Sequence, residues 1–496
     1  MQLFFLNSKL ALRDLESDVI SGEEVVALLD DRALEDGMPI YLDDETMMPI
    51  EPHCSWGRSL SNAELRMGTM KEYGRILARF SDHQEHRGRD VLSATESDVK
   101  AYKRVRTVLQ KRPIQDAAWG KESQLLDRFY GYLKDDAGLL KHRPVRAGSR
   151  GRNPLAPKMK QKMDIRHLTL GQYRYLRDVG LGGQLPDSSV DPSFRGWSPH
   201  RNRGAADLAL GTGMRWQEWA TVLLPEMGIG VGHPVKDVEF TVQACAKYGK
   251  ARPIYVPDDS MKGLEPYLLL ERPEQAVTSA KRLQKRHRDL FVVSRIDHES
   301  GLVYGTLDGL EKVFTMSAMD PQLRRIAVHE TDVGLEALAV FICQGGLMPM
   351  ADSWKRYRHA AWRRMVALAD EHTPVLPRKR WRWHDLRHTY ALQMLNYLER
   401  QMDGEEPDAA ARRRRHRSYL SSHIRLNPLL IVSRRLGHSS PATTYEYLEY
   451  TDDLLNEFDD AFRGWVGELG SEATYAQIAS HAFRLEKRGS ADAAQR

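Results

Sequence analysis

Five residues in three separate motifs have the side chains that phosphodiester cleavage without a metal would require. The first motif contains Arg215, the second contains His384 and Arg387, and the third places His438 nine positions before Tyr447. Two arginines, which are always protonated, can hold the non-bridging oxygens on which negative charge builds during attack. The histidines can donate to the same oxygens or move a proton near neutral pH. We therefore expect Tyr447 to be a nucleophile whose attack the other four side chains support.

Each of these residues alone also has a purely structural interpretation. Arg215 could form an ordinary helical ion pair with the glutamate three positions later. His438 could cap a helix, and Tyr447 lies close to Tyr445 and Tyr450 in a segment that could be a plain amphipathic helix. A phenol with the usual pKa of about 10 is a poor nucleophile, but a dense set of cationic donors stabilises the phenolate. The joint occurrence of the three motifs in this order favours the catalytic interpretation.

The order and spacing of these motifs resemble the active site of the tyrosine recombinases, the integrase family that cuts and rejoins DNA without metal or ATP. The resemblance covers the catalytic half of the chain and, more weakly, a helical segment before it. It implies that Tyr447 becomes joined to the 3′ phosphate of the broken strand and that no cofactor is used. Tyr447 matches the family's spacing from the histidine, whereas Tyr445 is two residues short and Tyr450 is three residues long.

The resemblance also implies a lysine in a β-hairpin turn that protonates the leaving 5′ oxygen. Residues 238–257 contain two extended patterns on either side of a glycine-containing turn, which predicts such a hairpin. The first basic residue of the turn is Lys247, which we take as the general acid. Lys250 is the alternative, and Lys250 and Arg252 are otherwise expected to contact phosphates.

A metal site is the main alternative for the second motif. His384 and His388 are four positions apart and Asp385 follows the first, a pattern similar to a zinc-protease helix. Aspartate replaces the usual glutamate, Arg387 would add a fixed positive charge beside the metal, and no third ligand is obvious. We therefore expect no metal, and we expect His388 to face away from the phosphate and hold the helix.

Length and composition set the class of protein. A chain of 496 residues predicts about three domains. No apolar run approaches the roughly 20 residues of a membrane span, and the N-terminus lacks the pattern of a signal peptide. Three cysteines, Cys54, Cys245 and Cys343, lie far apart, which fits a reducing cytoplasm. The net charge of +5 permits nucleic-acid binding. We expect a cytoplasmic, nucleoid-associated protein of bacterial or phage context.

Two basic segments could neutralise DNA phosphates. Residues 141–162 combine lysines and arginines with prolines and glycines, which indicates an interdomain linker that can lie along DNA. Residues 412–417 are almost entirely arginine. For both segments, the alternative to DNA contact is a flexible connection that is exposed to solvent. The expected phosphate contacts outside the hairpin are Arg146, Arg150, Arg152, Lys158, Lys160, Arg413 and Arg414.

The predicted fold is mainly α with a small antiparallel β-sheet (α+β). Residues 69–83 carry apolar side chains on one helical face, Thr95 is a plausible N-cap with Asp98 three positions on, and residues 125–133 form another helix. These helices resemble the core-binding domain of the integrases, which with the catalytic domain forms a C-shaped clamp around DNA. The expected divisions are an acidic N-terminal extension of unknown role (1–55), a helical core-binding domain (56–147), a basic linker (148–165), an integrase-like catalytic domain (166–466) with insertions near 258–340 and 399–425, and a C-terminal tail (467–496).

The sequence therefore predicts a site-specific DNA recombinase of a phage or other mobile element. Its expected partners are double-stranded DNA, three further copies of the chain in a homotetramer on two DNA sites, and accessory recombination or DNA-bending proteins. The tail is expected to pack on a neighbouring protomer, and no membrane is involved. The alternatives are a type IB topoisomerase, which would relax supercoils by the same chemistry, and a DNA-binding accessory factor of a transposition system.

Overall fold

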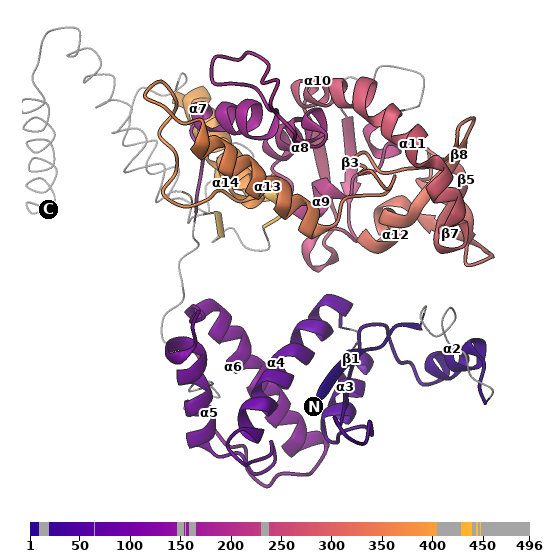
Figure 1. Cartoon of the computed structure of the whole chain (residues 1–496), viewed down its shortest axis with the longest axis vertical. Coiled ribbons are helices and arrows are strands. Elements are labelled where there is room, and N and C mark those ends of the chain that lie inside the picture. Colours follow the sequence, from indigo (N-terminus) through magenta and orange to yellow (C-terminus); the bar gives the residue numbers. More distant parts are fainter. Residues whose placement is uncertain are drawn as a thin grey trace, which may run out of the picture. The chain divides into compact units, whose positions relative to one another are not determined.

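The computed structural model describes two compact units, Met1–Lys162 and Met163–Arg496 (Figure 1). The described residues are 1–8, 19–63, 65–145, 153, 155–157, 165–229, 238–403, 428–438, 443, 444 and 447, with side chains omitted for 396–403 and 428. Within these ranges, no helix combines the length and the apolar character that spanning a membrane would need.

The first unit is a helical bundle with a small two-stranded sheet. Its elements are β1 (Gln2–Phe5), α2 (Gly22–Asp31), β2 (Pro39–Leu42), α3 (His53–Asn62), α4 (Met67–Glu85), α5 (Glu96–Arg104) and α6 (Asp116–Gly131). The strands pair antiparallel, and Tyr41 of β2 is buried in the same core as the helices. Residues of the predicted N-terminal extension, such as Tyr41, thus share a hydrophobic core with the helices that follow.

The helices of this unit form where the sequence predicts them. In α4, Ile76, Leu77 and Phe80 are buried on one face, which confirms the predicted amphipathic pattern. Thr95 is the N-cap of α5, as predicted: its backbone N–H donates to the Asp98 carboxylate at 2.9 Å and its hydroxyl oxygen accepts from the Asp98 backbone N–H, which together form a capping box. The mainly helical fold class is therefore confirmed.

The second unit combines helices with a hairpin and a five-stranded sheet. Its helices are α7 (Leu170–Arg174), α8 (Pro199–Thr212), α9 (Trp216–Ala220), α10 (Asp258–Pro266), α11 (Arg272–Lys285), α12 (Pro321–Ile326), α13 (Ala351–Ala367), α14 (Trp383–Asp403) and α16 (Pro428–Leu436), with the wider helical turns η4 (Tyr175–Leu181) after α7. Its strands are β3 (Val238–Val242), β4 (Arg252–Val256), β5 (Phe291–Asp297), β6 (Leu302–Leu307), β7 (Leu310–Thr315), β8 (Ala327–Thr331) and β9 (Gly334–Ala337).

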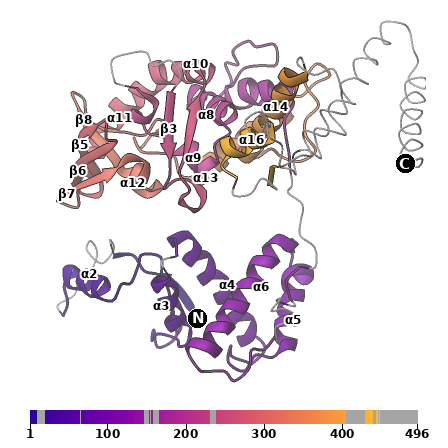
Figure 2. The same ribbon diagram turned by 180° about the vertical axis from the view of Figure 1, so that it is seen from behind.

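Strands β3 and β4 form the predicted antiparallel hairpin, with Val238 opposite Val256 and Val242 opposite Arg252. The larger sheet has the order β7-β6-β5-β8-β9 and contains one parallel pair, β5 with β8, which the sequence prediction of an antiparallel sheet did not include. Residues 258–340, the predicted insertion, form this sheet together with α10, α11 and α12. Both views place the sheet at the opposite end of the unit from α14 and α16 (Figure 2).

An aromatic cluster joins the two helices that carry the first two motifs. Trp219 of α9 and Trp383 of α14 have ring centroids 4.9 Å apart. Trp354 of α13 packs edge-on against both, at 4.8 and 5.4 Å. Aromatic pairs in this geometry contribute about 0.5–1.5 kcal/mol each beyond their buried area. The cluster fixes α9, which begins directly after Arg215, against the helix that contains His384.

A buried ion pair fastens the five-stranded sheet to the rest of the unit. Arg324 of α12 donates to both carboxylate oxygens of Glu226, at 2.6 and 2.7 Å. Its remaining donors reach the backbone carbonyls of Thr221, Met316 and Met319. A fully buried guanidinium is tolerated only when its donors are satisfied in this way.

Candidate active site

Arg215 is held at the N-terminus of α9 by a capping box. Its backbone N–H donates to Glu218 at 2.7 Å, and its Nη1 donates to the same carboxylate at 3.2 Å. The chain reaches Arg215 through Gly213, whose φ of 60° ends α8; a Cβ there would lie 2.4 Å from Tyr390. The Arg215 side chain keeps 24% of its surface exposed, so part of its guanidinium fork can meet a ligand.

Arg387 connects the three motifs. From α14, its Nη1 donates to the carbonyl oxygen of Gly213 at 2.7 Å and its Nη2 donates to that of Leu436 at 2.6 Å. These carbonyls stand just before Arg215 and His438 in the sequence. Burial and the positive charge of Arg215 lower the pKa of Arg387 to about 9, so the guanidinium stays charged at neutral pH.

His438 follows a second left-handed glycine. Gly437 has a φ of 64°, and a Cβ there would lie 2.4 Å from the side chain of Arg252. Nδ1 of His438 is 2.8 Å from the Thr444 hydroxyl. Burial, followed by the charges of Arg387 and Arg215, lowers the pKa of His438 to about 3. The imidazole is therefore neutral at physiological pH.

His384 is neutral for the same reasons, although it still presents an exposed surface. Loss of hydration among the surrounding protein atoms, followed by the positive charges of Arg387 and Arg215, lowers the pKa of His384 to about 4. Lys247 also contributes to this shift, so its ammonium lies within electrostatic reach of His384. A bound phosphate would add negative charge and raise the pKa of both histidines.

Lys247 occupies the turn that joins β3 to β4, as predicted. It is exposed, and its Nζ lies 4.9 Å from the ring centroid of Tyr248. Tyr248 has a left-handed φ of 63°, which is unusual for a residue with a large side chain. Its side chain is 79% exposed. Lys250 ends the turn and is also exposed. The hairpin thus presents both lysines to solvent, and the ammonium group of Lys247 is close enough to affect the pKa of His384.

Tyr447 is buried, with 1% of its surface exposed. Its ring lies nearly parallel to that of His438, with centroids 6.2 Å apart. Its hydroxyl oxygen is 2.8 Å from Nδ1 of His388. His388, which was expected to face away from the phosphate and hold its helix, therefore also contacts the predicted nucleophile.

Arg252 also departs from its predicted role as a phosphate contact. Only 6% of its side chain is exposed. Its Nη2 donates to Glu218, and its Nη1 donates to the backbone carbonyl of Arg435 at 3.1 Å. Glu218 is thus the buried counterion between Arg215 and Arg252. Sequence reasoning missed this role because a glutamate three residues after an arginine has an ordinary helical explanation.

Seven further predicted phosphate contacts lie outside the described residues. They are Arg146, Arg150, Arg152, Lys158, Lys160, Arg413 and Arg414. The competing tyrosines 445 and 450 and the predicted tail 467–496 also lie outside them.

The two histidines of the metal-like pattern contact each other edge-on, with ring centroids 4.7 Å apart. In the described part of the chain, no group of three or more histidine, cysteine, aspartate or glutamate side chains could hold a metal ion.

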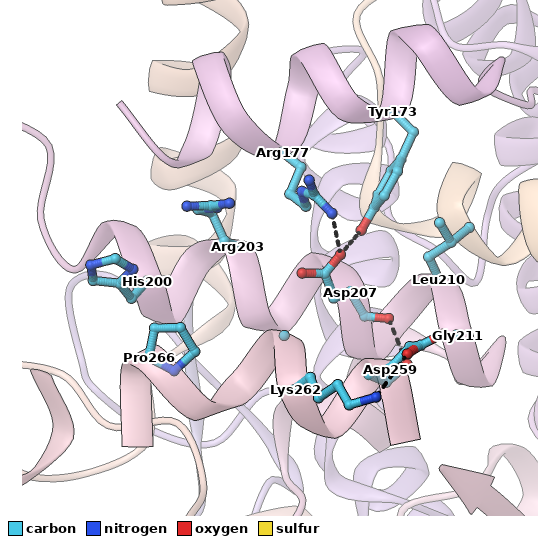
Figure 3. A pocket seen from close by; sticks show the side chains of 12 residues that line it. Tyr173, Arg177, His200, Arg203, Asp207, Leu210, Gly211, Asp259, Lys262 and Pro266 are labelled. Atoms are coloured by element: carbon cyan, nitrogen blue, oxygen red, sulfur yellow. Dashed lines mark hydrogen bonds and ion pairs between the residues drawn. The ribbon is translucent and has the colours of Figure 1, made fainter. Parts of the chain in front are cut away.

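A cavity of about 460 Å³ lies beside α8 and α10 (Figure 3). Within it, the Tyr173 hydroxyl donates to Asp207 at 2.5 Å, and burial raises the pKa of that carboxyl. Arg177 and Arg203 both pair with Asp178, at 2.8 and 2.9 Å. These charged side chains are engaged with one another, so the cavity wall is a structural network that holds η4 against α8.

No protein-family model matches the sequence, and no curated protein matches it. One solved structure that matches is the XerH site-specific recombinase bound to difH substrate in a pre-cleavage complex. It is 12% identical in sequence, and the match covers 92% of this chain and 93% of the XerH chain, with a TM-score of 0.40. The Tn1549 transposon integrase in complex with transposon right end DNA is 13% identical over 86% of this chain and 96% of that one (TM-score 0.41). The XerA recombinase is 15% identical over 84% and 96% (TM-score 0.28).

All three are tyrosine recombinases. The three alignments extend over most of each chain, with TM-scores of 0.28 to 0.41. The chemistry of the site is inferred from the contacts of this chain's own residues.

Proposed function

We propose that this chain is a site-specific DNA recombinase that cleaves and rejoins strands through a phosphotyrosyl intermediate on Tyr447. The observation that carries the proposal is the meeting of the three motifs around Arg387, whose two terminal nitrogens donate to backbone carbonyls two residues before Arg215 and two residues before His438. The Tyr447 ring lies against His438 in the same place. Residues spread over more than two hundred positions of sequence thus form one polar cluster.

The contacts suggest different tasks for the two arginines. Arg215 is partly exposed and pre-positioned by Glu218, so it is the direct ligand of a scissile phosphate. Arg387 is buried and holds two loops in place, so it contributes positive charge and geometry. His384 and His438 are neutral imidazoles that gain a proton, or share one, when negative charge arrives. Removing one such donor typically reduces the rate of a phosphate or acyl transfer by about 10²–10³-fold.

The proposed reaction is a balanced transesterification. The Tyr447 hydroxyl gives its proton to a basic group of the site as its oxygen forms a bond to phosphorus, the bond from phosphorus to the 5′ oxygen breaks, and that oxygen takes a separate proton from Lys247. The phosphotyrosyl bond conserves the energy of the broken bond, so a 5′ hydroxyl of another strand can reverse the step without ATP. The role in a phage or other mobile element, the action as a homotetramer on two DNA sites, and the help of accessory proteins are parts of the same proposal.

The proposal is tested by trapping the covalent adduct with denaturant in cells that carry the DNA surrounding the coding sequence. The native chain should yield adduct, and sequencing the trapped DNA identifies the cleavage site. Tyr447→Phe should abolish the adduct, whereas the matched variant Tyr445→Phe should retain it. Native protein that binds DNA without forming any adduct would contradict the proposal and favour an accessory role.

A type IB topoisomerase would use the same chemistry, and the same site geometry supports it equally. A plasmid that carries two copies of the recovered site separates the two activities. Exchange of the flanking segments supports recombination, and relaxation without exchange supports the topoisomerase.

A further inference from the structure

The hydroxyl of Tyr447 is in contact with an imidazole that the motifs did not assign to catalysis. Tyr447 and His388 are both buried, with 1% and 2% of their surfaces exposed. The hydroxyl oxygen and His388 Nδ1 are 2.8 Å apart, a normal hydrogen-bond distance. A hydroxyl this deeply buried cannot pass its proton directly to bulk water. The proton must leave through a group in contact with it, and His388 is such a group.

We propose that His388 is the general base that takes the proton of Tyr447 during strand cleavage. With its own hydrogen on Nε2, the imidazole accepts at Nδ1. The O–H bond of Tyr447 breaks, the proton moves to His388 Nδ1, and the freed electron pair forms the bond to phosphorus. The 5′ oxygen leaves with the electrons of the broken bond and takes a separate proton from Lys247. This inference rests on the proposed function, because it requires Tyr447 to be the nucleophile.

The neighbouring imidazoles are arranged for other tasks. The His438 ring lies nearly parallel to the Tyr447 ring, with centroids 6.2 Å apart, and its Nδ1 is engaged with Thr444. His384 packs edge-on against His388 from the same helix. Arg387 supplies a fixed positive charge that interacts electrostatically with Tyr447. Positive charge at this position stabilises the phenolate that forms as the proton leaves.

The test compares single-turnover cleavage of two duplexes that carry the cleavage site recovered from the trapped adduct. One duplex is unmodified, and the other has sulfur in place of the bridging 5′ oxygen, a leaving group that needs no proton. His388→Gln keeps a hydrogen-bonding side chain of similar reach but is not a base at neutral pH. His388→Phe keeps the ring volume and serves if the glutamine variant does not fold. Lys247→Ala is the matched control for the other proton.

We expect His388→Gln to bind DNA normally and to cleave about 10²–10⁴-fold more slowly than the native chain, the usual contribution of a general base. Sulfur should restore cleavage by Lys247→Ala and should not restore cleavage by His388→Gln.

Three results would overturn the inference: a His388→Gln rate within about threefold of native, a faster rate, or rescue of this variant by sulfur. A faster rate would mean that the hydrogen bond with His388 holds Tyr447 in an unreactive position instead of activating it. Failure of the proposed function looks different, because it would appear as an adduct that persists in Tyr447→Phe or that the native chain never forms.

Discussion

Glu218→Gln is the substitution that most directly tests how the arginine cluster is held together. Glu218 accepts from the backbone N–H of Arg215, from Arg215 Nη1 and from Arg252 Nη2, and its side chain is fully buried. Glutamine fills the same space but has one acceptor oxygen and no charge. The amide group would meet a guanidinium with its own N–H donors.

The expected cost follows from these contacts. A hydrogen bond to a charged group contributes about 1.5–3 kcal/mol, and at least one such bond is lost. Arg215, Arg252 and Arg387 would then face one another without their buried carboxylate. Breaking a buried ion pair by removing one partner typically costs about 3–5 kcal/mol. We therefore expect the free energy of unfolding to fall by about 3–5 kcal/mol at neutral pH.

Urea denaturation of both proteins measures this change. Glu239→Gln, on the exposed face of β3, removes the same charge and should alter the free energy of unfolding by no more than about 0.5 kcal/mol. Sulfate should stabilise Glu218→Gln more than the native chain, because a bound anion can replace the lost carboxylate. A loss below about 1 kcal/mol, or one equal to that of Glu239→Gln, would refute the assignment of Glu218 as the counterion.

Three further predictions follow from the site and its supports. Lys247→Ala should slow single-turnover cleavage by about 10²–10⁴-fold and Lys250→Ala by less than about tenfold, and the reverse order would transfer the acid role to Lys250. Because the pKa values of His384 and His438 lie near 4 and 3 and a phosphate raises them, DNA binding should take up protons. Affinity at constant ionic strength should therefore rise as pH falls from about 6.5 to 4, by up to about tenfold per unit for each proton, and a pH-independent affinity would contradict this. Arg324→Met should lower the free energy of unfolding by about 3–5 kcal/mol by leaving a buried carboxylate unpaired, and urea denaturation showing no loss would argue against that ion pair.

Local features of this chain were predictable from sequence because nearby residues determine them. The capping box of Thr95 and Asp98 needs residues three positions apart, and the hairpin around Lys247 follows from a turn between two extended segments. The motifs themselves were also readable, because each is recognised from residue types at short, fixed spacings.

Roles that depend on long-range contacts were not predictable. Arg252 reaches a carboxylate 34 residues earlier and a carbonyl 183 residues later, so its burial could not be inferred from a basic turn. His388 meets Tyr447 across 59 residues. Its position four residues after His384 indicated only that the two share a helical face. Likewise, the parallel pairing of β5 and β8 depends on how the intervening residues fold, and local sequence patterns do not specify it.

The measurement that tests the central claim most directly is mass spectrometry of the peptide that remains joined to DNA after nuclease and protease digestion of the trapped adduct. The account predicts a nucleotide phosphate on Tyr447, lost in Tyr447→Phe and retained in Tyr445→Phe. A nucleotide on Tyr445, Tyr450 or any other residue, or the recovery of no modified peptide from protein that has bound and cut DNA, would contradict it.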